Sequence, residues 1–252
     1  MKIGFCSSVD SCVVLKELGY DFIEMPVAQI MGNDYRQVGE KVKKVNIECT
    51  AFNCFIPARF SIIDCYVHGK KELTEYYQKA IDRVADLGGK IIVFGSGAAR
   101  YVPAGFENNT ATDIIASFVD ECADYAEQYD ITIAVEHLNK DETNILNSVN
   151  EVASFVNKID KGNVKILVDT YHMLKEKEDI AILGKVINDV AHIHIADLEG
   201  RSYPHKNIEF YMALSNILKN SHYKGAVSVE CAVGDLAFDA KMAIKFIENN
   251  VI

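Results

Sequence analysis

The feature that most constrains the fold of this chain is a series of eight short apolar runs separated by stretches with helical spacing. The runs show no polar alternation, as expected for parallel strands covered by helices on one face and by a packed interior on the other. They are residues 2–5, 20–24, 46–52, 90–94, 131–135, 164–168, 191–195 and 226–229. Apolar residues three and four apart indicate helices at 70–87, 110–128, 148–159, 180–188, 207–220 and 239–249.

Eight strand–helix units in 252 residues have the size of a closed (β/α)8 barrel. The competing α/β architecture, an open doubly wound sheet, needs a glycine-rich turn after its first strand to hold a dinucleotide. Here the first strand runs into Cys6, Ser7 and Ser8, and no such turn follows. No linker rich in proline, glycine or serine divides the chain. We therefore expect an α/β protein with a single TIM barrel domain over residues 1–252.

The composition of the chain limits which classes of binding partner and which cellular compartment are expected. With 26 Lys and Arg against 36 Asp and Glu, the formal charge of −10 disfavours a nucleic-acid partner, and no basic run compensates for it. The seven cysteines are scattered and never spaced as CxxC, which argues against a disulfide framework and a thiolate zinc site and predicts reduced, mostly buried thiols. Neither a signal peptide nor an apolar run of about 20 residues is found. We expect a soluble cytoplasmic protein without a membrane partner.

The chemistry is expected at the carboxyl ends of the strands, which form the active face of such barrels. The last four predicted strands lead to Glu136, Asp169, His194 and Glu230. Their spacings of 33, 25 and 36 residues each approximate one strand–helix unit, so the four side chains are expected at one height around half of the barrel rim. In the strands that lead to Glu136 and Glu230, small residues two and four positions earlier leave space for a site above them.

Three carboxylates at such close range would raise one another's pKa unless a cation compensated for their charge. One such residue alone is more often a strand-end cap or an ion-pair partner, but four at matching positions favour a metal site. Oxygen ligands with one imidazole suit Mn²⁺, with Mg²⁺, Co²⁺ or Zn²⁺ as alternatives. We expect one divalent metal ion, with Mn²⁺ as the first candidate.

Three segments resemble the xylose isomerase-like barrels, and among them the ketose 3-epimerases related to tagatose and psicose epimerase. The segments are 136–147 (EHLNKDETNILN), 167–173 (LVDTYHM) and 191–197 (AHIHIAD), followed by Arg201, and strand eight ends in Val-Glu as in that family. The resemblance covers the whole barrel in order, although its specific motifs lie in the second half. It implies an isomerase of carbohydrate metabolism acting on a small sugar or sugar phosphate.

The same resemblance assigns roles to individual residues. It implies that the metal is held by Glu136, Asp169, His194 and Glu230. It also implies that Glu142, His172 and Arg201 hold the sugar. Because members of the family commonly form dimers or tetramers, we expect a homo-oligomer.

The predicted reaction moves or inverts the hydrogen beside a ketose carbonyl through a metal-stabilised enediolate. Glu136 and Glu230 are the predicted catalytic acid and base. Glutamates on opposite faces of the enediolate give epimerisation, whereas a single facing glutamate gives aldose–ketose isomerisation, and both outcomes stay open. His192 lies two residues before His194 and is expected to support the site or the core rather than to bind metal.

Two further substrate contacts are predicted from the first half of the barrel. Glycines in the segment 94–100, with Arg100 beside them, either cradle a substrate phosphate or form a structural turn. His68 follows strand three on the active side and either lines the pocket or is an ordinary loop histidine.

Two other activities known from this fold are kept as alternatives. A dehydratase of cyclic polyols such as inosose would use the same metal and acid–base groups. A nuclease of the endonuclease IV type needs extra histidine ligands, but the segment 206–209 reads KNIE where that family has an Asp-x-His pair. The negative charge also disfavours the nuclease.

Overall fold

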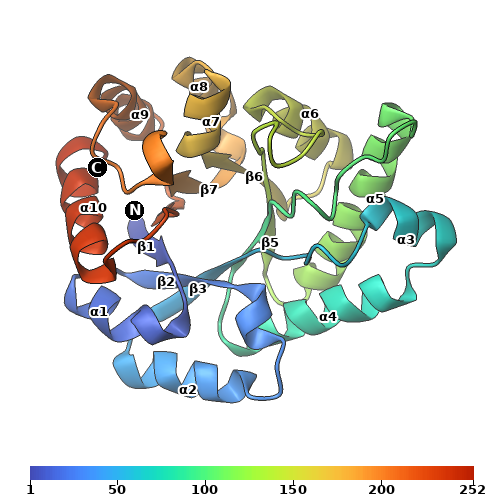
Figure 1. Ribbon diagram of the computed structural model, residues 1–252, viewed down its shortest axis with the longest axis horizontal. Helices are drawn as coiled ribbons and strands as arrows, with labels where there is room; N and C mark the ends of the chain where they lie inside the picture. Colours follow the sequence, from blue (N-terminus) through green and yellow to red (C-terminus); the bar gives the residue numbers. More distant parts are fainter.

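The computed structural model describes residues 1–252 and contains eight parallel strands in a closed barrel, ordered β1 to β8 (Figure 1). Pairing of β1 with β8 closes the ring. The barrel prediction is confirmed, and every predicted strand lies within two residues of an observed one at each end. The strands are β1 Lys2–Cys6, β2 Phe22–Pro26, β3 Glu48–Asn53, β4 Ile91–Phe94, β5 Thr132–Glu136, β6 Val164–Asp169, β7 Val190–Ile195 and β8 Ala226–Val229.

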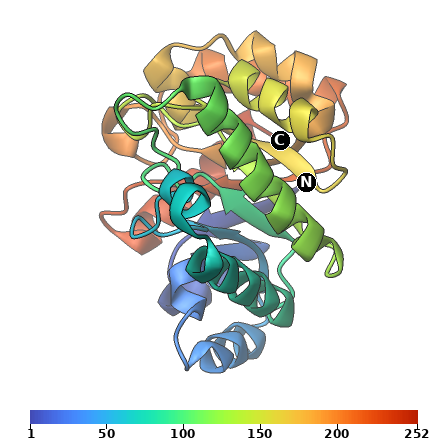
Figure 2. The ribbon, with the colours of Figure 1, turned by 90° about the vertical axis from the view of Figure 1, so that its right-hand side faces the viewer.

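Helices surround the barrel, and Figure 2 shows the long helix α5 crossing its outside next to α4. The helices are α1 Cys12–Glu17, α2 Tyr35–Val45, α3 Ile62–His68, α4 Lys71–Asp86, α5 Asn108–Glu127, α6 Val149–Ile159, α7 Thr170–Glu176, α8 Leu183–Val186, α9 Ile208–Asn220 and α10 Leu236–Asn250. Short 3-10 turns lie at η1 Val9–Ser11, η2 Val27–Ile30, η3 Ile180–Ile182, η4 Ile187–Asp189 and η5 Glu199–Arg201. None of the helices combines the length and apolar character that crossing a bilayer requires.

Several helices differ from the prediction, and α1, α2, α3 and α7 lie outside the predicted ranges. The segment 180–188 is divided among η3, α8 and η4 instead of forming one helix. Helix α10 begins earlier than predicted because the Asp235 side chain accepts a hydrogen bond from the Phe238 amide, at 3.0 Å, and caps the first turn. Helix α2 was not among the predicted helices, although Tyr35, Val38, Val42 and Val45 stand at helical spacing and belong to the core or pack against it.

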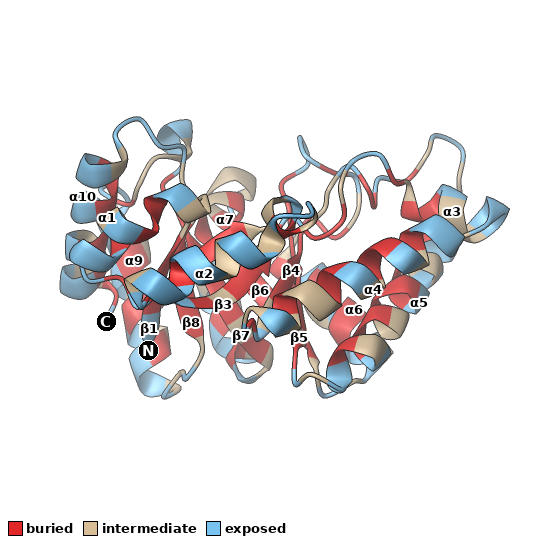
Figure 3. Ribbon diagram, turned by 90° about the horizontal axis from the view of Figure 1, so that it is seen from below, coloured by how far each residue is buried: buried red, intermediate tan, exposed pale blue.

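The main core lies between the barrel and its helices, and Figure 3 shows buried strands enclosed by helices that are exposed on their outer faces. One continuous cluster of 60 buried hydrophobic residues extends from Ile3 to Val251. Because this cluster includes residues from every strand, we propose that residues 1–252 form one domain. Of the seven cysteines, all free, three are buried, fewer than predicted.

Inside the barrel, small and large side chains alternate to fill the base. Phe22 packs with Ala51 and Ala226 in one interior cluster, and a Cβ on Gly4 would lie 2.2 Å from the Phe22 ring. The next interior cluster contains Val93, Ala134 and Leu167. These packed clusters form a floor, and because side chains alternate along a strand, the inward-facing residues above them come from the strand ends.

Candidate active site

Four side chains from the second half of the barrel converge above this floor. Glu136 ends β5, Asp169 ends β6, His194 lies in β7 and Glu230 follows β8. Each offers one ligand atom, and these four atoms lie within 4.8 Å of one another. Asp169 and His194 are direct neighbours in the β6–β7 register, which places them at one height. The structure thus brings together all four residues that the sequence predicts as metal ligands.

The donor atoms in this cluster fit a divalent cation. His194 Nδ1 lies 3.4 Å from Glu136 Oε1 and 3.2 Å from Glu230 Oε2. Both His194 Nδ1 and Glu136 Oε1 are buried without a hydrogen-bond partner. Buried polar atoms are rarely left unsatisfied, and a carboxylate–imidazole set of this composition suits Mn²⁺ or Mg²⁺.

The electrostatics of the cluster are governed by burial and by Arg201. Burial raises the pKa of Asp169 well above its usual range, with the Glu230 and Glu136 carboxylates adding to the rise and Arg201 opposing it. For Glu230, burial is outweighed by His194 and Arg201, which lower its pKa to about 2. The Arg201 Nη2 atom contacts Glu230 and lies 3.0 Å from Asp169 Oδ2.

His172 lies at the edge of the cluster with a defined tautomer. Its Nδ1 accepts hydrogen bonds from the backbone and side-chain nitrogens of Asn139, at 3.2 and 2.8 Å. Burial lowers the pKa of His172 to about 4, so the neutral ring carries its proton on Nε2, which lies 3.5 Å from Asp169 Oδ2. Asn139 also donates to Glu142 Oε1, and this carboxylate lies 3.7 Å from Arg201 Nη1. The three predicted sugar contacts therefore gather beside the four converging residues.

Glu24 is a site residue that the sequence reasoning missed. It lies in β2, is fully buried inside the barrel, and contacts both His192 and His194. The signal was present in the sequence, because the second predicted strand also ends in a carboxylate, at residue 24. His192 contacts Glu24 and is not one of the four converging residues, and its supporting role stays a prediction.

The loop after β4 has a different role from the phosphate cradle considered above. Arg100 is fully buried, its Nη1 donates to the Phe94 carbonyl at 3.2 Å, and burial lowers its pKa to about 10. A Cβ on Gly95 would lie 2.2 Å from Glu136 Oε2, and one on Gly97 would lie 2.7 Å from the Glu142 carbonyl oxygen. The glycines therefore make room for the β5 carboxylate and its loop, and the enclosed Arg100 guanidinium does not face a substrate phosphate.

His68 does not join the site either. It is the last residue of α3, it is exposed, and Figure 1 shows α3 at the outer edge of the molecule, away from the barrel axis. The chain leaves β3, crosses a loop and packs α3 against α5, which carries this histidine outward. The structure therefore does not bring His68 to the four converging residues.

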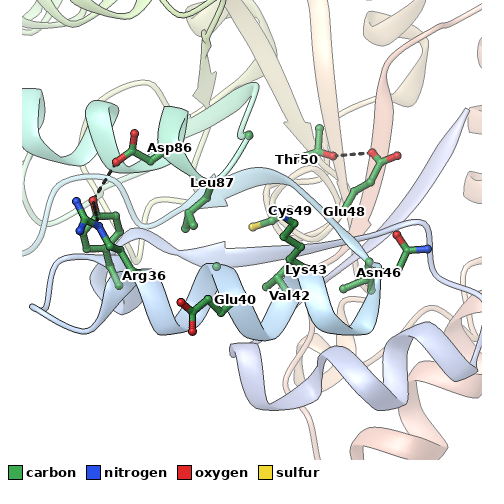
Figure 4. A pocket seen from close by; sticks show the side chains of 14 residues that line it. Arg36, Glu40, Val42, Lys43, Asn46, Glu48, Cys49, Thr50, Asp86 and Leu87 are labelled. Carbon is green, nitrogen blue, oxygen red and sulfur yellow. Dashed lines mark hydrogen bonds between the residues drawn. The ribbon is translucent and has the colours of Figure 1, made fainter.

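A surface groove lies at the other end of the barrel. It has a volume of 790 Å³ and lies between α2, the start of β3 and the end of α4 (Figure 4). Charges of both signs line it, including Arg36, Glu40 and Asp86. Residues at the amino-terminal ends of barrel strands serve stability rather than catalysis. The groove is therefore separate from the converging carboxylates.

A family model described as xylose isomerase-like TIM barrel matches residues 12–249. The chain belongs to this family. The resemblance seen in the sequence is thus confirmed, and the family's position for catalysis, the carboxyl ends of the strands, is where the four side chains converge.

Curated relatives include the D-psicose 3-epimerase of Enterocloster bolteae, 31% identical over 56% of this chain. That match spans only 48% of the relative's length. The L-ribulose 3-epimerase of Methylomonas sp. is 26% identical over 84% of this chain and 74% of its own length. Among solved structures, a D-psicose 3-epimerase in the presence of D-fructose superimposes with a TM-score of 0.86 at 20% identity, covering 100% of this chain and 99% of that one. This last likeness establishes the fold.

Proposed function

We propose that this protein is a metal-dependent ketose 3-epimerase. The observation that carries the proposal is the convergence of Glu136, Asp169, His194 and Glu230 within 4.8 Å, at the active face of a barrel of this family. The named activities of the relatives, D-psicose 3-epimerase and L-ribulose 3-epimerase, support the choice of carbon. No specific observation favours the polyol dehydratase or the nuclease.

The four converging residues would hold the metal, and we propose Mn²⁺ as the ion because the donor set has three carboxylates and one imidazole. A divalent cation bound there would act as a Lewis acid for the oxygens of the substrate carbonyl and its neighbouring hydroxyl. Asp169 and His194 have no further role in this scheme than to hold the ion.

Glu136 and Glu230 would exchange the proton at carbon 3. They come from β5 and from the end of β8, with β6 and β7 between them, so their carboxylates reach the centre from different directions. One carboxylate removes the proton from one face of the substrate, and the other returns a proton to the opposite face. Two-sided exchange inverts the configuration, which is an epimerisation rather than an aldose–ketose isomerisation.

The neighbouring polar residues would orient the sugar. His172 presents its Nε2 proton toward the cluster, so it donates to a substrate oxygen. The Glu142 carboxylate accepts from a hydroxyl, while Arg201 donates to one. We propose an unphosphorylated ketose, because Arg100 is enclosed in the fold and the named activities of the relatives act on free sugars.

The test is an epimerisation assay with purified protein, freed of metal and then supplied with Mn²⁺, on a panel of free and phosphorylated ketoses. Chromatography of the products should show the carbon 3 epimer of a free ketose, formed only with the metal. Unchanged turnover after complete metal removal would refute metal dependence, and an aldose product would refute epimerisation. Preferred turnover of a ketose phosphate would refute the choice of free sugar.

Assembly into a homo-oligomer stays a prediction. Light scattering coupled to size-exclusion chromatography measures the mass of the assembly directly, and a multiple of 28.1 kDa is expected. A mass of one chain across the concentration range would contradict it.

A further inference from the structure

A carboxylate with no role in the proposed acid–base chemistry is buried beneath the four converging side chains. Glu24 has no exposed surface and comes from β2, on the side of the barrel away from β5 and β6. Its Oε1 lies 2.9 Å from His194 Nε2, and its Oε2 lies 2.8 Å from His192 Nε2. Ser228 Oγ donates to the same Oε2 at 2.7 Å. Three neighbouring groups thus surround the two carboxylate oxygens.

The two oxygens of Glu24 decide where the imidazole protons lie. Oε1 faces His194 Nε2 at 2.9 Å and Oε2 faces His192 Nε2 at 2.8 Å, and a carboxylate oxygen accepts the hydrogen of the ring nitrogen that it faces. Both imidazoles therefore carry a proton on Nε2. The other ring nitrogen of His194, Nδ1, is therefore the one directed at the cluster, 3.2 Å from Glu230 Oε2. Only this orientation offers the cation a nitrogen lone pair.

Stability alone gives no reason for a charge at this position. Taking a carboxylate out of water costs several kcal/mol, and apolar side chains of similar size often replace buried ion pairs without loss of stability. The floor directly below consists of apolar residues. Among them are Phe22, two residues before Glu24 in β2, and Ala226, two residues before Ser228 in β8. A local departure from an apolar interior beside a functional site is typical of a residue kept for function.

We propose that Glu24 is a positioning residue that fixes the ring orientation and the tautomer of His194 for metal binding. This inference rests on the proposed function, because it requires a cation at Glu136, Asp169, His194 and Glu230. A carboxylate that accepts from the far nitrogen of a metal-binding histidine also makes that ligand more basic, and removal of such partners typically lowers metal affinity by about 10- to 100-fold.

The experiment measures Mn²⁺ affinity by titration followed through the electron paramagnetic resonance signal of the free ion. Glu24→Leu removes both acceptor oxygens, and Glu24→Gln keeps one oxygen that is able to serve His194. We expect affinity to fall in the order wild type, Glu24→Gln, Glu24→Leu, with a loss of about 10- to 100-fold for the leucine variant. Ser228→Ala is the matched control, because it removes a hydrogen bond to Glu24 and leaves the contact with His194 intact.

Thermal unfolding of the metal-free proteins separates positioning from folding. The Glu24 variants should keep a cooperative transition, and if the leucine variant does not fold, the isosteric glutamine variant decides the question. If both variants fold and bind Mn²⁺ with wild-type affinity, the inference is overturned while the proposed function stays intact. Absence of Mn²⁺ binding by the wild type would overturn both. Two bound ions in the wild type, with only one lost in the variants, would make Glu24 a ligand and overturn the positioning role.

Discussion

Arg201 Nη2 lies 3.0 Å from Asp169 Oδ2 and also contacts Glu230, so one guanidinium bridges two of the four predicted metal ligands. The same side chain lies over the Tyr171 ring, with its Cζ 4.7 Å from the ring centroid. A guanidinium in this place offsets the charge of the carboxylates, and a bound cation would do the same. Arg201 and a bound metal ion would therefore compete for the same oxygens.

This competition predicts the effect of Arg201→Met. The variant should bind Mn²⁺ at least as tightly as the wild type, because no guanidinium has to leave the carboxylates. Its KM for the ketose should rise, because a hydrogen-bond donor to the sugar is lost, by about 10-fold or more for a charged donor. Titration with Mn²⁺ and steady-state kinetics check the two effects separately. A fall in metal affinity with an unchanged KM would contradict the assignment.

Replacing either predicted catalytic glutamate should remove turnover. Glu136→Gln and Glu230→Gln keep the size of the side chain and remove the proton acceptor, so kcat should fall by about 100- to 10,000-fold. Because both residues are also predicted ligands, kcat has to be measured at saturating Mn²⁺, with occupancy determined by metal analysis. Near-normal kcat in a fully occupied variant would remove that glutamate from the mechanism.

Gly95→Ala should lower kcat without unfolding the protein. The added methyl would lie 2.2 Å from Glu136 Oε2, the end of a flexible side chain, so the carboxylate must move while the backbone stays. A displacement of about 1 Å at a reacting group costs on the order of 100-fold in rate. Gly184→Ala is the control, since a Cβ there meets nothing within 4 Å. Equal kcat in the two variants would show that Gly95 does not position Glu136.

The Asn139–His172 hydrogen bonds predict a change in sugar binding and none in metal binding. Asn139→Leu removes the 2.8 Å side-chain bond to His172 Nδ1 and the bond to Glu142, so two sugar-orienting groups lose their support. We expect a higher KM with an unchanged Mn²⁺ affinity. The opposite pattern, weaker metal binding at constant KM, would place His172 among the metal-supporting residues.

Metal binding should stabilise the folded protein. An ion present at about 100 times its Kd adds about 2.7 kcal/mol to the free energy of unfolding. For a chain of this size that corresponds to a rise in Tm of roughly 5 to 10 °C, reversed by a chelator. Asp169→Asn should abolish most of this rise. A Tm that does not respond to Mn²⁺ would contradict a metal site at these residues.

The barrel and the four converging residues were accessible from sequence because both depend on local patterns. Short apolar runs mark the strands, and in a closed barrel the strand ends necessarily meet at one face, so Glu136 and Asp169 could be placed without coordinates. Helix α2 was equally open to prediction, because Tyr35, Val38 and Val42 lie at helical spacing on the face that packs against the core.

The remaining features depend on contacts between distant segments. Glu24 and His194 are 170 residues apart, and their hydrogen bond follows from β2 and β7 facing each other across the barrel. The role of the loop after β4 could not be predicted from its sequence, because Gly-Ser-Gly is equally compatible with an anion cradle and with close packing. The position of the Glu136 carboxylate against Gly95 distinguishes these alternatives. The position of His68 could not be read from the sequence, because the direction of the chain after β3 is set by the packing of α3 on α5.

The most direct test of the proposed reaction is the position of deuterium in a ketose recovered after incubation with the Mn²⁺-loaded protein in D₂O. After removal of Mn²⁺ from the sample, nuclear magnetic resonance of the sugar should show deuterium at carbon 3 and the carbon 3 epimer. When the metal is chelated before incubation, neither product should form. Deuterium at carbon 1 with formation of an aldose would contradict the two-glutamate epimerisation. Exchange at carbon 3 that persists without metal would contradict the role of the four converging residues.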